Sequence, residues 1–496
     1  MPLHRLREDH RGRAPGRRAQ GGLRVTAPDP ATARSPGPSG AGETVIENVA
    51  VAPVAGPDIR RGYLHVRDGR VAALGEGPAP ALPGAARVDG AGCLATPGLV
   101  NTHHHLYQWA TQGTAQDAPL FGWLTALYRV WAAMDAEVVG GAATAALAWL
   151  ALSGCTTTTD HHYVFPKGRG DLFAAEIEAA RSVGLRFHPC RGSMDRGASQ
   201  GGLPPDEVVE SLEEILAATA EAVDAHHDPA PGSMLRVAVA PCSPFSVSAD
   251  LMTESAALAR DKGVRLHTHL CETAEEERHC VEQMGCTPVD YMEKLGWLGP
   301  DVWVAHAVHL HDRDLARFAA TGTGVAHCPS SNGRLGAGIA RVAEMLRAGV
   351  AVGLGVDGAA SSELTPLAGE MRQALLFQRA RYGPSALTAR QALEAATLGG
   401  ARCLGREDEI GSLEPGKLAD VVLWRVDGFA AALDDPVCAL VFGGRPEVAL
   451  ALVGGRTVVR DGELRTVPQD TAARLGADAH RRLTRLAGDV LPGPPG

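Results

Sequence analysis

The sequence predicts an α/β fold: a (β/α)8 barrel of the TIM type, with a small β-sandwich domain built from the N- and C-terminal segments. Three observations support this prediction. Short apolar segments alternate with longer Ala- and Leu-rich stretches through the middle of the chain. Ionisable residues end several of these segments, where a barrel places its active site. Short strands with turns between them occur near both ends. The 496 residues, 45% of them hydrophobic, suffice for one large core or two moderate ones.

Eight barrel strands are predicted between residues 97 and 404. The first enters His103, and the others are Cys155–Asp160, Leu185–Cys190, Leu235–Ala240, Val264–His269, Val302–His306, Gly324–Cys328 and Val350–Asp357. The stretches between them, such as residues 206–225, have the composition of helices. Eight alternations over about 300 residues favour a closed barrel over a doubly wound sheet.

The two ends of the chain are expected to share the second domain. Residues 44–96 hold alternating segments with an Asp-Gly turn typical of a hairpin, and residues 405–470 return to this pattern. Residues 471–496 are expected to form a C-terminal helix and tail. Residues 1–43, rich in Arg, Pro, Gly and Ala, are predicted to be a disordered tail, with a transit peptide as the alternative.

The composition argues against two classes of partner. With 47 basic and 57 acidic side chains, the formal net charge is −10. The composition therefore predicts no basic surface for binding nucleic acid or an anionic membrane. No stretch approaches the roughly 18–20 apolar residues of a transmembrane helix. The ten cysteines lack a CxxC pair, as in a reduced, cytoplasmic protein. We therefore expect a small-molecule partner, with no nucleic acid and no membrane.

Histidines give the main chemical signal. His103 and His105 are one residue apart at the end of the first predicted strand. At a strand period of two they face the same side, while His104 faces away. Two imidazoles in this arrangement can bind one metal ion.

Further metal-competent or acid–base residues complete the pattern. His269, His306 and Asp357 each end a later strand, and Glu272 follows His269 by three residues. The carboxyl ends of barrel strands meet at one face, so these side chains are expected to meet there too. The sequence therefore predicts a metal-dependent active site.

The chain resembles the amidohydrolase superfamily, most closely the branch of 8-oxoguanine deaminase, guanine deaminase and the hydroxytriazine hydrolases. The segments that carry the resemblance are Pro97–His105, His267–Glu272, Ala305–Leu310, His327–Asn332, Val356–Ser361 and Gly411–Asp420. The metal ligands that the resemblance implies are His103, His105, His269 and Asp357. The catalytic residues that it implies are Glu272, His306 and Asp357. Members of the family often form oligomers, so a homo-oligomer is expected.

The number of metal ions is predicted from an absence. Binuclear members of the family bridge two metals with a carboxylated lysine on the fourth strand, and the fourth predicted strand, Leu235–Pro241, contains no lysine. We therefore expect one Zn2+ per chain, held by three imidazoles and a carboxylate. Fe2+ is the alternative, because some related deaminases use it.

The resemblance implies hydrolytic deamination of a small aminated heterocycle, with 8-oxoguanine, converted to urate and ammonia, as the first candidate. Guanine, isocytosine, a pterin, or an s-triazine with an amino or chloro substituent would keep the same mechanism. Cyclic-amide hydrolysis is disfavoured by the missing lysine, and a metal-free scaffold by the intact ligand positions.

Four residues are predicted to bind the substrate: Gln108, Trp131, Arg191 and Asn332. Gln108 and Trp131 belong to an aromatic-rich insertion, residues 106–135, which is expected to form a lid; ordinary packing onto the barrel is the alternative. The Gln108 amide can bond an amide-like ring edge in both directions. The planar fork of Arg191 suits a ring carbonyl and nitrogen, with an ordinary salt bridge as the alternative. The chain departs from the branch pattern at residues 109–113 and at Gly333.

Overall fold

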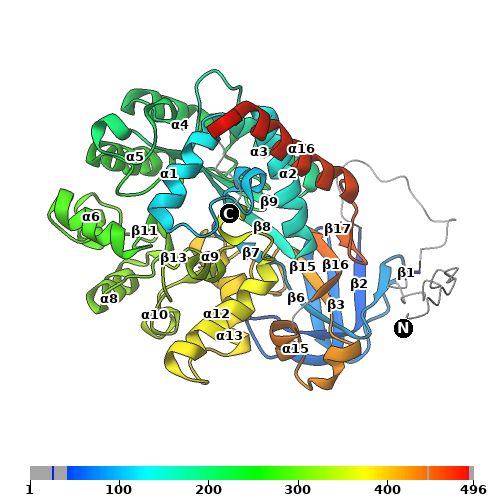
Figure 1. The fold of residues 1–496 in the computed structure, drawn as a ribbon. Helices are drawn as coiled ribbons and strands as arrows, with labels where there is room; N and C mark the ends of the chain where they lie inside the picture. Colours follow the sequence, from blue (N-terminus) through cyan, green and yellow to red (C-terminus); the bar gives the residue numbers. More distant parts are fainter. Residues whose placement is uncertain (1–24, 27–41, 444–445, 491–496) are drawn as a thin grey trace, which may run out of the picture.

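A closed barrel of eight parallel strands forms the centre of the protein (Figure 1). The computed structural model describes residues 25–26, 42–443 and 446–490. The barrel strands are β7 (Leu99–Asn101), β8 (Cys155–His162), β9 (Arg186–Ser193), β10 (Ala238–Pro241), β11 (Leu266–Leu270), β12 (Val302–His306), β13 (Gly324–His327) and β14 (Val352–Leu354). Pairing of β14 with β7, Leu354 opposite Asn101, closes the ring. The predicted (β/α)8 barrel is confirmed.

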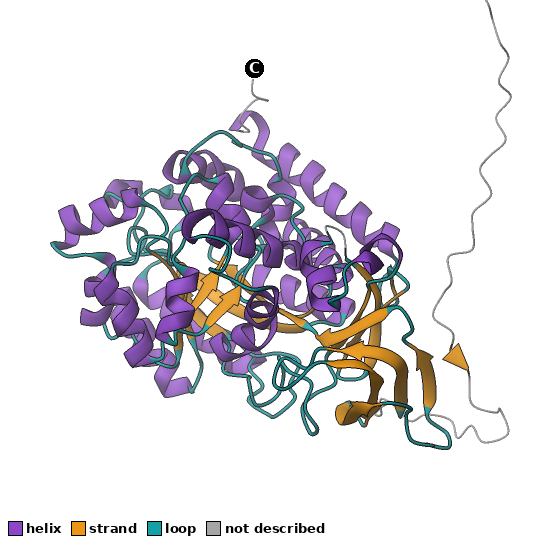
Figure 2. Cartoon of the chain, turned by 90° about the horizontal axis from the view of Figure 1, so that it is seen from below, coloured by secondary structure: helices purple, strands orange, loops and turns teal. Residues whose placement is uncertain are grey.

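Helices surround the barrel (Figure 2). Ser211, Ser248 and Thr273 begin three of them by accepting a backbone N–H, and left-handed Gly184 and Gly263 end two. In chain order the helical segments up to β12 are η2 (Leu106–Thr111), α1 (Leu120–Trp131), α2 (Ala136–Leu152), α3 (Leu172–Val183), η3 (Ala198–Gln200), η4 (Asp206–Val208), α4 (Leu212–His226), α5 (Ala249–Lys262), α6 (Ala274–Met284) and α7 (Pro288–Lys294). Those that follow are α8 (Asp312–Thr321), α9 (Pro329–Arg334), α10 (Val342–Ala348), α11 (Ala359–Ser362), α12 (Leu367–Tyr382), α13 (Ala389–Glu394), η5 (Ala395–Gly399) and α14 (Gly400–Cys403).

The additional sheet predicted from the two ends of the chain is present beside the barrel (Figure 1). Its N-terminal strands are β1 (Val25–Thr26), β2 (Thr44–Val51), β3 (Ile59–Arg67), β4 (Arg70–Glu76), β5 (Ala86–Asp89) and β6 (Cys93–Pro97). Its C-terminal strands are β15 (Val421–Arg425), β16 (Glu447–Val453), β17 (Arg456–Arg460) and β18 (Glu463–Leu464), with η6 (Gly428–Ala432) and α15 (Pro436–Phe442) between β15 and β16. Antiparallel pairing of β6 with β15 joins the two ends.

The tail predicted to be disordered lies almost entirely outside the described residues. Within it, β1 pairs antiparallel with β5, which the disorder prediction did not anticipate. None of the helices in the described ranges combines the length and the hydropathy that a membrane span requires.

The C-terminal helix α16 (Gln469–Ala487), red in Figure 1 and followed by η7 (Gly488–Val490), packs on α2. Ala479 and Leu483 join Val138 and Ala142 in one apolar cluster. The Arg482 guanidinium pairs with the Asp135 carboxylate at 2.7 Å, at the start of α2. The C-terminal helix therefore covers the base of the 106–135 insertion.

A buried ion pair links the barrel to the additional sheet. Arg186, the first residue of β9, donates from Nε to Asp420 Oδ2 at 2.6 Å and from a second nitrogen to Oδ1 at 3.0 Å. Asp420, just before β15, also accepts the Gly454 N–H at 2.7 Å. Both ionic side chains are at most 3% exposed. The bidentate geometry satisfies groups that would be costly to bury alone.

We expect Asp420→Ala to lower the free energy of unfolding by about 3–5 kcal/mol, because it leaves a buried guanidinium unpaired. Urea denaturation monitored by circular dichroism measures the change. The exposed Asp434 provides the control, Asp434→Ala, which should stay within about 0.5 kcal/mol of wild type. Equal stabilities of the two variants would show that this pair does not stabilise the junction.

Candidate metal centre

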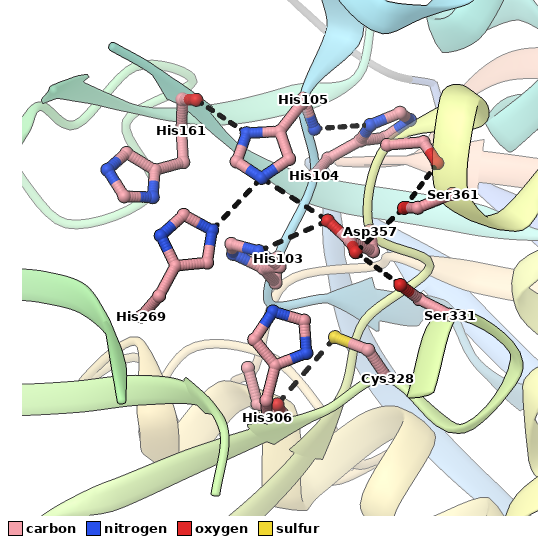
Figure 3. A network of polar contacts seen from close by, with 12 residues as sticks. His103, His104, His105, His161, His269, His306, Cys328, Ser331, Asp357 and Ser361 are labelled. Carbon is pink, nitrogen blue, oxygen red and sulfur yellow. Dashed lines mark hydrogen bonds and ion pairs between the residues drawn. The ribbon is translucent and has the colours of Figure 1, made fainter. Parts of the chain in front are cut away.

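The predicted metal ligands lie together at the carboxyl ends of the barrel strands (Figure 3). His269 belongs to β11, and Asp357 follows β14 by three residues. His103 and His105 lie beyond the end of β7 at Asn101, so they are not on the strand as predicted. Their common orientation therefore comes from hydrogen bonds to other strands of the barrel, β8 and β11, and not from the pleat of β7.

Three imidazole nitrogens and one carboxylate oxygen converge on one point. His105 Nε2 lies 3.1 Å from His269 Nε2. Asp357 Oδ1 lies 3.3 Å from His103 Nε2 and 3.2 Å from His105 Nε2. All four residues are buried. The other carboxylate oxygen, Oδ2, accepts hydrogen bonds from the hydroxyls of Ser331 at 2.5 Å and Ser361 at 2.8 Å, which leaves Oδ1 to face the histidines.

The outer nitrogens of His105 and His269 fix the tautomers. His105 Nδ1 lies 2.7 Å from the His161 carbonyl oxygen, and His269 Nδ1 lies 2.7 Å from the Cys242 carbonyl oxygen. A carbonyl oxygen only accepts, so each Nδ1 must carry the proton. Each Nε2 therefore directs a lone pair toward the centre, as in a metal-ligating histidine.

His103 reaches the same state through a second histidine. His267 Nδ1 donates to the Trp303 carbonyl oxygen at 2.9 Å, so neutral His267 has its lone pair on Nε2. His103 Nδ1 lies 2.8 Å from that nitrogen and donates to it. The lone pair of His103 Nε2 therefore also faces the centre, where this nitrogen has no hydrogen-bond partner.

This donor set fits a metal cation. Burial lowers the pKa of His103 and of His269 well below the ordinary histidine value, so both imidazoles are neutral. Facing lone pairs repel one another unless a cation lies between them. Three neutral imidazoles and a carboxylate form a zinc-type donor set. His103, His105, His269 and Asp357 are therefore the residues that could hold a metal ion.

Two further predicted residues, Glu272 and His306, adjoin this centre. Their closest side-chain atoms, Glu272 Oε2 and His306 Nε2, are 3.7 Å apart. Burial, and then the charge of Asp357, raises the pKa of Glu272 well above the usual carboxyl value. His306 Nδ1 lies 3.0 Å from Asn332 Oδ1 and donates to it, so the lone pair of His306 is on Nε2.

The backbone is strained where these strands end. His306 has φ = 73°, Ala307 has φ = 49° and Asp357 has φ = 58°, a left-handed region that side chains other than glycine rarely adopt. Such strain persists where the surroundings over-determine the conformation, and it is concentrated at functional sites.

A cavity opens above the four converging atoms. Besides the residues already described, the lining consists of residues from the 106–135 insertion and from segments that follow barrel strands: Gln108, Leu120, Trp123, Leu124, Tyr128, Tyr163, Cys242 and Leu335. Trp123 Nε1 donates to the Ala360 carbonyl oxygen at 3.1 Å and thereby ties α1 to α11. The predicted lid therefore lies over the cavity in this structure.

Gln108 is the one predicted substrate-binding residue that the structure places in the cavity lining. Its amide oxygen and nitrogen are both buried without a hydrogen-bond partner. The amide lies against Gly358, where an ideal Cβ would fall 1.7 Å from Gln108 Oε1. The glycine after Asp357 therefore makes room for this amide.

The other three predicted substrate-binding residues lie outside the cavity lining. Trp131 packs behind it, with Nε1 donating to Thr111 Oγ1 at 3.1 Å. Asn332 bonds His306. Arg191 is buried in a bidentate pair with Glu210, at 2.8 and 3.0 Å. The alternative for Arg191, a salt bridge, is therefore what the structure contains.

Sequence reasoning missed several lining residues that two simple signals mark. Leu120, Leu124 and Tyr128 recur every four residues, which places them on one face of α1. Tyr163 and Cys242 each follow the last residue of a barrel strand directly. Helical periodicity and strand ends together could have found all five.

Residues 94–458 match the Amidohydrolase family. An 8-oxoguanine deaminase from Pseudomonas aeruginosa is 44% identical, over 81% of this chain and 90% of the relative. An isoxanthopterin deaminase from an unknown prokaryotic organism is 37% identical, over 88% of this chain and 93% of the relative. The chain belongs to the amidohydrolase family.

The crystal structure of an amidohydrolase relative supports the metal assignment. An atrazine chlorohydrolase from Arthrobacter aurescens, complexed with zinc, matches with a TM-score of 0.83 and 32% identity, over 89% of this chain and all of the relative. A family fold that accommodates zinc agrees with the donor set found in this chain.

We expect His269→Ala to abolish stoichiometric zinc binding, because it removes one of three converging lone pairs. Metal analysis of the purified, zinc-loaded variant by atomic emission measures the loss. The exposed His311 supplies the control, His311→Ala, which should retain the wild-type zinc content. Zinc retained at the wild-type level in His269→Ala would exclude His269 as a ligand.

Proposed function

We propose that this chain is a zinc-dependent aminohydrolase that cleaves the exocyclic C–N bond of a small cyclic amidine. The first candidate reaction is conversion of 8-oxoguanine to urate and ammonia. The observation that carries the proposal is the convergence of three imidazole lone pairs and Asp357 Oδ1 beneath a cavity with an unpartnered amide. The relative at 44% identity supports the choice of ring.

His103, His105, His269 and Asp357 would hold one Zn2+, with Fe2+ as the alternative for the same donors. When bound, the ion would supply Lewis acidity that lowers the pKa of a water molecule to about 7, so that hydroxide would be available at neutral pH. The outer nitrogens of the three imidazoles hold protons, so each Nε2 can offer its lone pair to the ion.

Protons are moved by Glu272, Asp357 and His306. Buried Glu272 is held protonated and can deliver a proton to a ring nitrogen, which makes the amidine carbon more electrophilic. Asp357 Oδ1 accepts no hydroxyl hydrogen bond, so it is the oxygen free to take a proton from the attacking water. His306 offers a lone pair on Nε2, which orients a water molecule or the leaving amine.

The cavity favours an uncharged planar ring. No Lys or Arg is among its described lining residues, so away from the proposed Zn2+ a phosphate or carboxylate would meet no opposite charge there. Leu120, Trp123 and Leu124 offer apolar surface for the ring faces. The Gln108 oxygen and nitrogen suit a ring edge with adjacent N–H and C=O groups, which 8-oxoguanine has. The buried Tyr128 hydroxyl, also unpartnered, offers a further polar contact.

Zinc-loaded protein should release ammonia from 8-oxoguanine with the highest kcat/KM in a panel that also contains guanine, isocytosine, isoxanthopterin and amino-s-triazines. Its nucleoside, 8-oxoguanosine, should be a poor substrate, because the lid residues Leu120, Trp123 and Leu124 line the cavity and leave little room for a sugar. A coupled ammonia assay measures both. Turnover of another ring in the panel would keep the reaction and replace the substrate, whereas no turnover of any member would contradict the proposal.

We expect Glu272→Gln to keep its zinc and to lower kcat by about 10²–10⁴-fold, because the amide cannot deliver a proton. Steady-state kinetics and metal analysis are measured on the same preparation. Glu275→Gln, an exposed change three residues along the chain, is the matched control and should keep wild-type kcat. Full activity of Glu272→Gln would exclude Glu272 as the proton carrier.

A further inference from the structure

Behind the metal centre lies a second group of buried titratable residues, Asp160 and His162 on β8 and Glu176 on α3. All three are fully buried. One polar atom of each lies within 4.8 Å of those of the other two. Among the described residues, Glu176 has His162 as its sole ion-pair partner, and Asp160 has none. Among the described residues, no lysine or arginine therefore offsets the negative charge that the two carboxyl groups would carry if they were ionised.

This group is connected to the segment that carries His105. Asp160 Oδ1 accepts the Leu106 N–H at 2.5 Å. The neighbouring His161 N–H donates to the His104 carbonyl oxygen at 2.7 Å. The His161 carbonyl oxygen accepts from His105 Nδ1, as Figure 3 shows. Two residues of β8 therefore hold three consecutive residues of the metal-binding segment.

The direction of the hydrogen bonds in this group follows from His162, which contacts the Val164 carbonyl oxygen. His162 Nε2 donates to the Val164 carbonyl oxygen at 3.0 Å, so a neutral His162 directs the lone pair of Nδ1 at Glu176 Oε2, 3.2 Å away. Two acceptors face each other there unless a proton lies between them. Burial raises the pKa of Glu176 to about 8 and that of Asp160 well above its usual range, so both carboxyl groups hold protons at neutral pH.

With one proton on each carboxyl group, every polar atom of the row can find a partner. The Leu106 N–H donates to Asp160. A protonated Asp160 can donate to Glu176, and a protonated Glu176 can donate from Oε2 to His162 Nδ1, 3.2 Å away. The row ends with the bond from His162 Nε2 to Val164. It carries no net charge, which avoids the cost of burying ionised groups.

We propose that Asp160, Glu176 and His162 form an uncharged, proton-carrying chain that fixes residues 104–106 and thereby the orientation of the His105 imidazole. They are positioning residues, because they act through the backbone of the metal-binding segment and touch no substrate. The effect on metal affinity rests on the proposed zinc centre. The chain itself is a property of the folded protein without metal.

Amide substitutions test this assignment directly. In D160N the amide oxygen accepts from Leu106 and the amide N–H donates to Glu176; in E176Q the amide does the same between Asp160 and His162. Both variants should therefore bind zinc within about threefold of wild type, the range of a neutral substitution. D160L and E176M, of similar size, remove the chain and should weaken zinc binding about 10–100-fold. E178Q, exposed on the same helix, is the control.

Zinc affinity is measured by competition with a chelator, and ligand geometry by the visible spectrum of the Co2+-loaded protein. The amide variants should keep the wild-type Co2+ spectrum, and the apolar variants should change it. Amide variants as impaired as the apolar ones would overturn the proposal, because an ionised group would then be required. A second zinc ion per chain that is lost in E176Q would also overturn it, by identifying the group as a cation site.

The unfolding temperature of the metal-free variants separates this proposal from the proposed function. D160N and E176Q should unfold at the wild-type temperature, and D160L at a lower one. If the wild-type protein bound no zinc but the variants still showed this pattern of unfolding temperatures, the proposed row of hydrogen bonds would stand and the proposed zinc-dependent function would be refuted. If D160L fails to fold, the zinc affinity and the unfolding temperature of D160N and E176Q test the proposal.

Discussion

The outward hydrogen bonds of the histidines are the constraint on which the rest of the site depends. Each outer imidazole nitrogen donates one hydrogen bond: that of His105 to the His161 carbonyl oxygen, that of His269 to the Cys242 carbonyl oxygen, and that of His103 to His267. These contacts leave three lone pairs directed at one point, close to Asp357 Oδ1. The acceptors belong to, or directly follow, other strands of the closed barrel. Barrel closure therefore sets the chemical state of the site as well as its position.

Carboxyl groups within this barrel are held in contrasting states. Asp357 accepts two serine hydroxyls, which suits an ionised carboxylate. Glu272, buried beside it, is held protonated. Neighbouring carboxyl groups whose surroundings favour opposite charge states are the usual basis of a division between acid and base. Where a charge is buried far from the site, as in the Arg186–Asp420 pair, a bidentate partner offsets it.

The lid extends the same site toward the surface. Helix α1 covers the cavity and is tied to α11 by the bond from Trp123 to the Ala360 carbonyl oxygen. The C-terminal helix supports the lid from outside through the pair between Arg482 and Asp135. Segments more than 300 residues apart in sequence thus contribute to one cavity whose described lining contains no Lys or Arg. A planar ring bound as proposed would meet the Gln108 amide there.

The sequence by itself determined the barrel, the additional sheet and the set of residues that meet at the metal centre, because periodicity and strand ends are local properties. It did not determine side-chain partners. Arg191 pairs with Glu210 and Trp131 bonds Thr111, contacts that only the tertiary structure creates. The same holds for Asp160 and Glu176, which local patterns cannot join. A pattern specifies which face a residue occupies, whereas tertiary packing decides which group it meets and whether it keeps a proton.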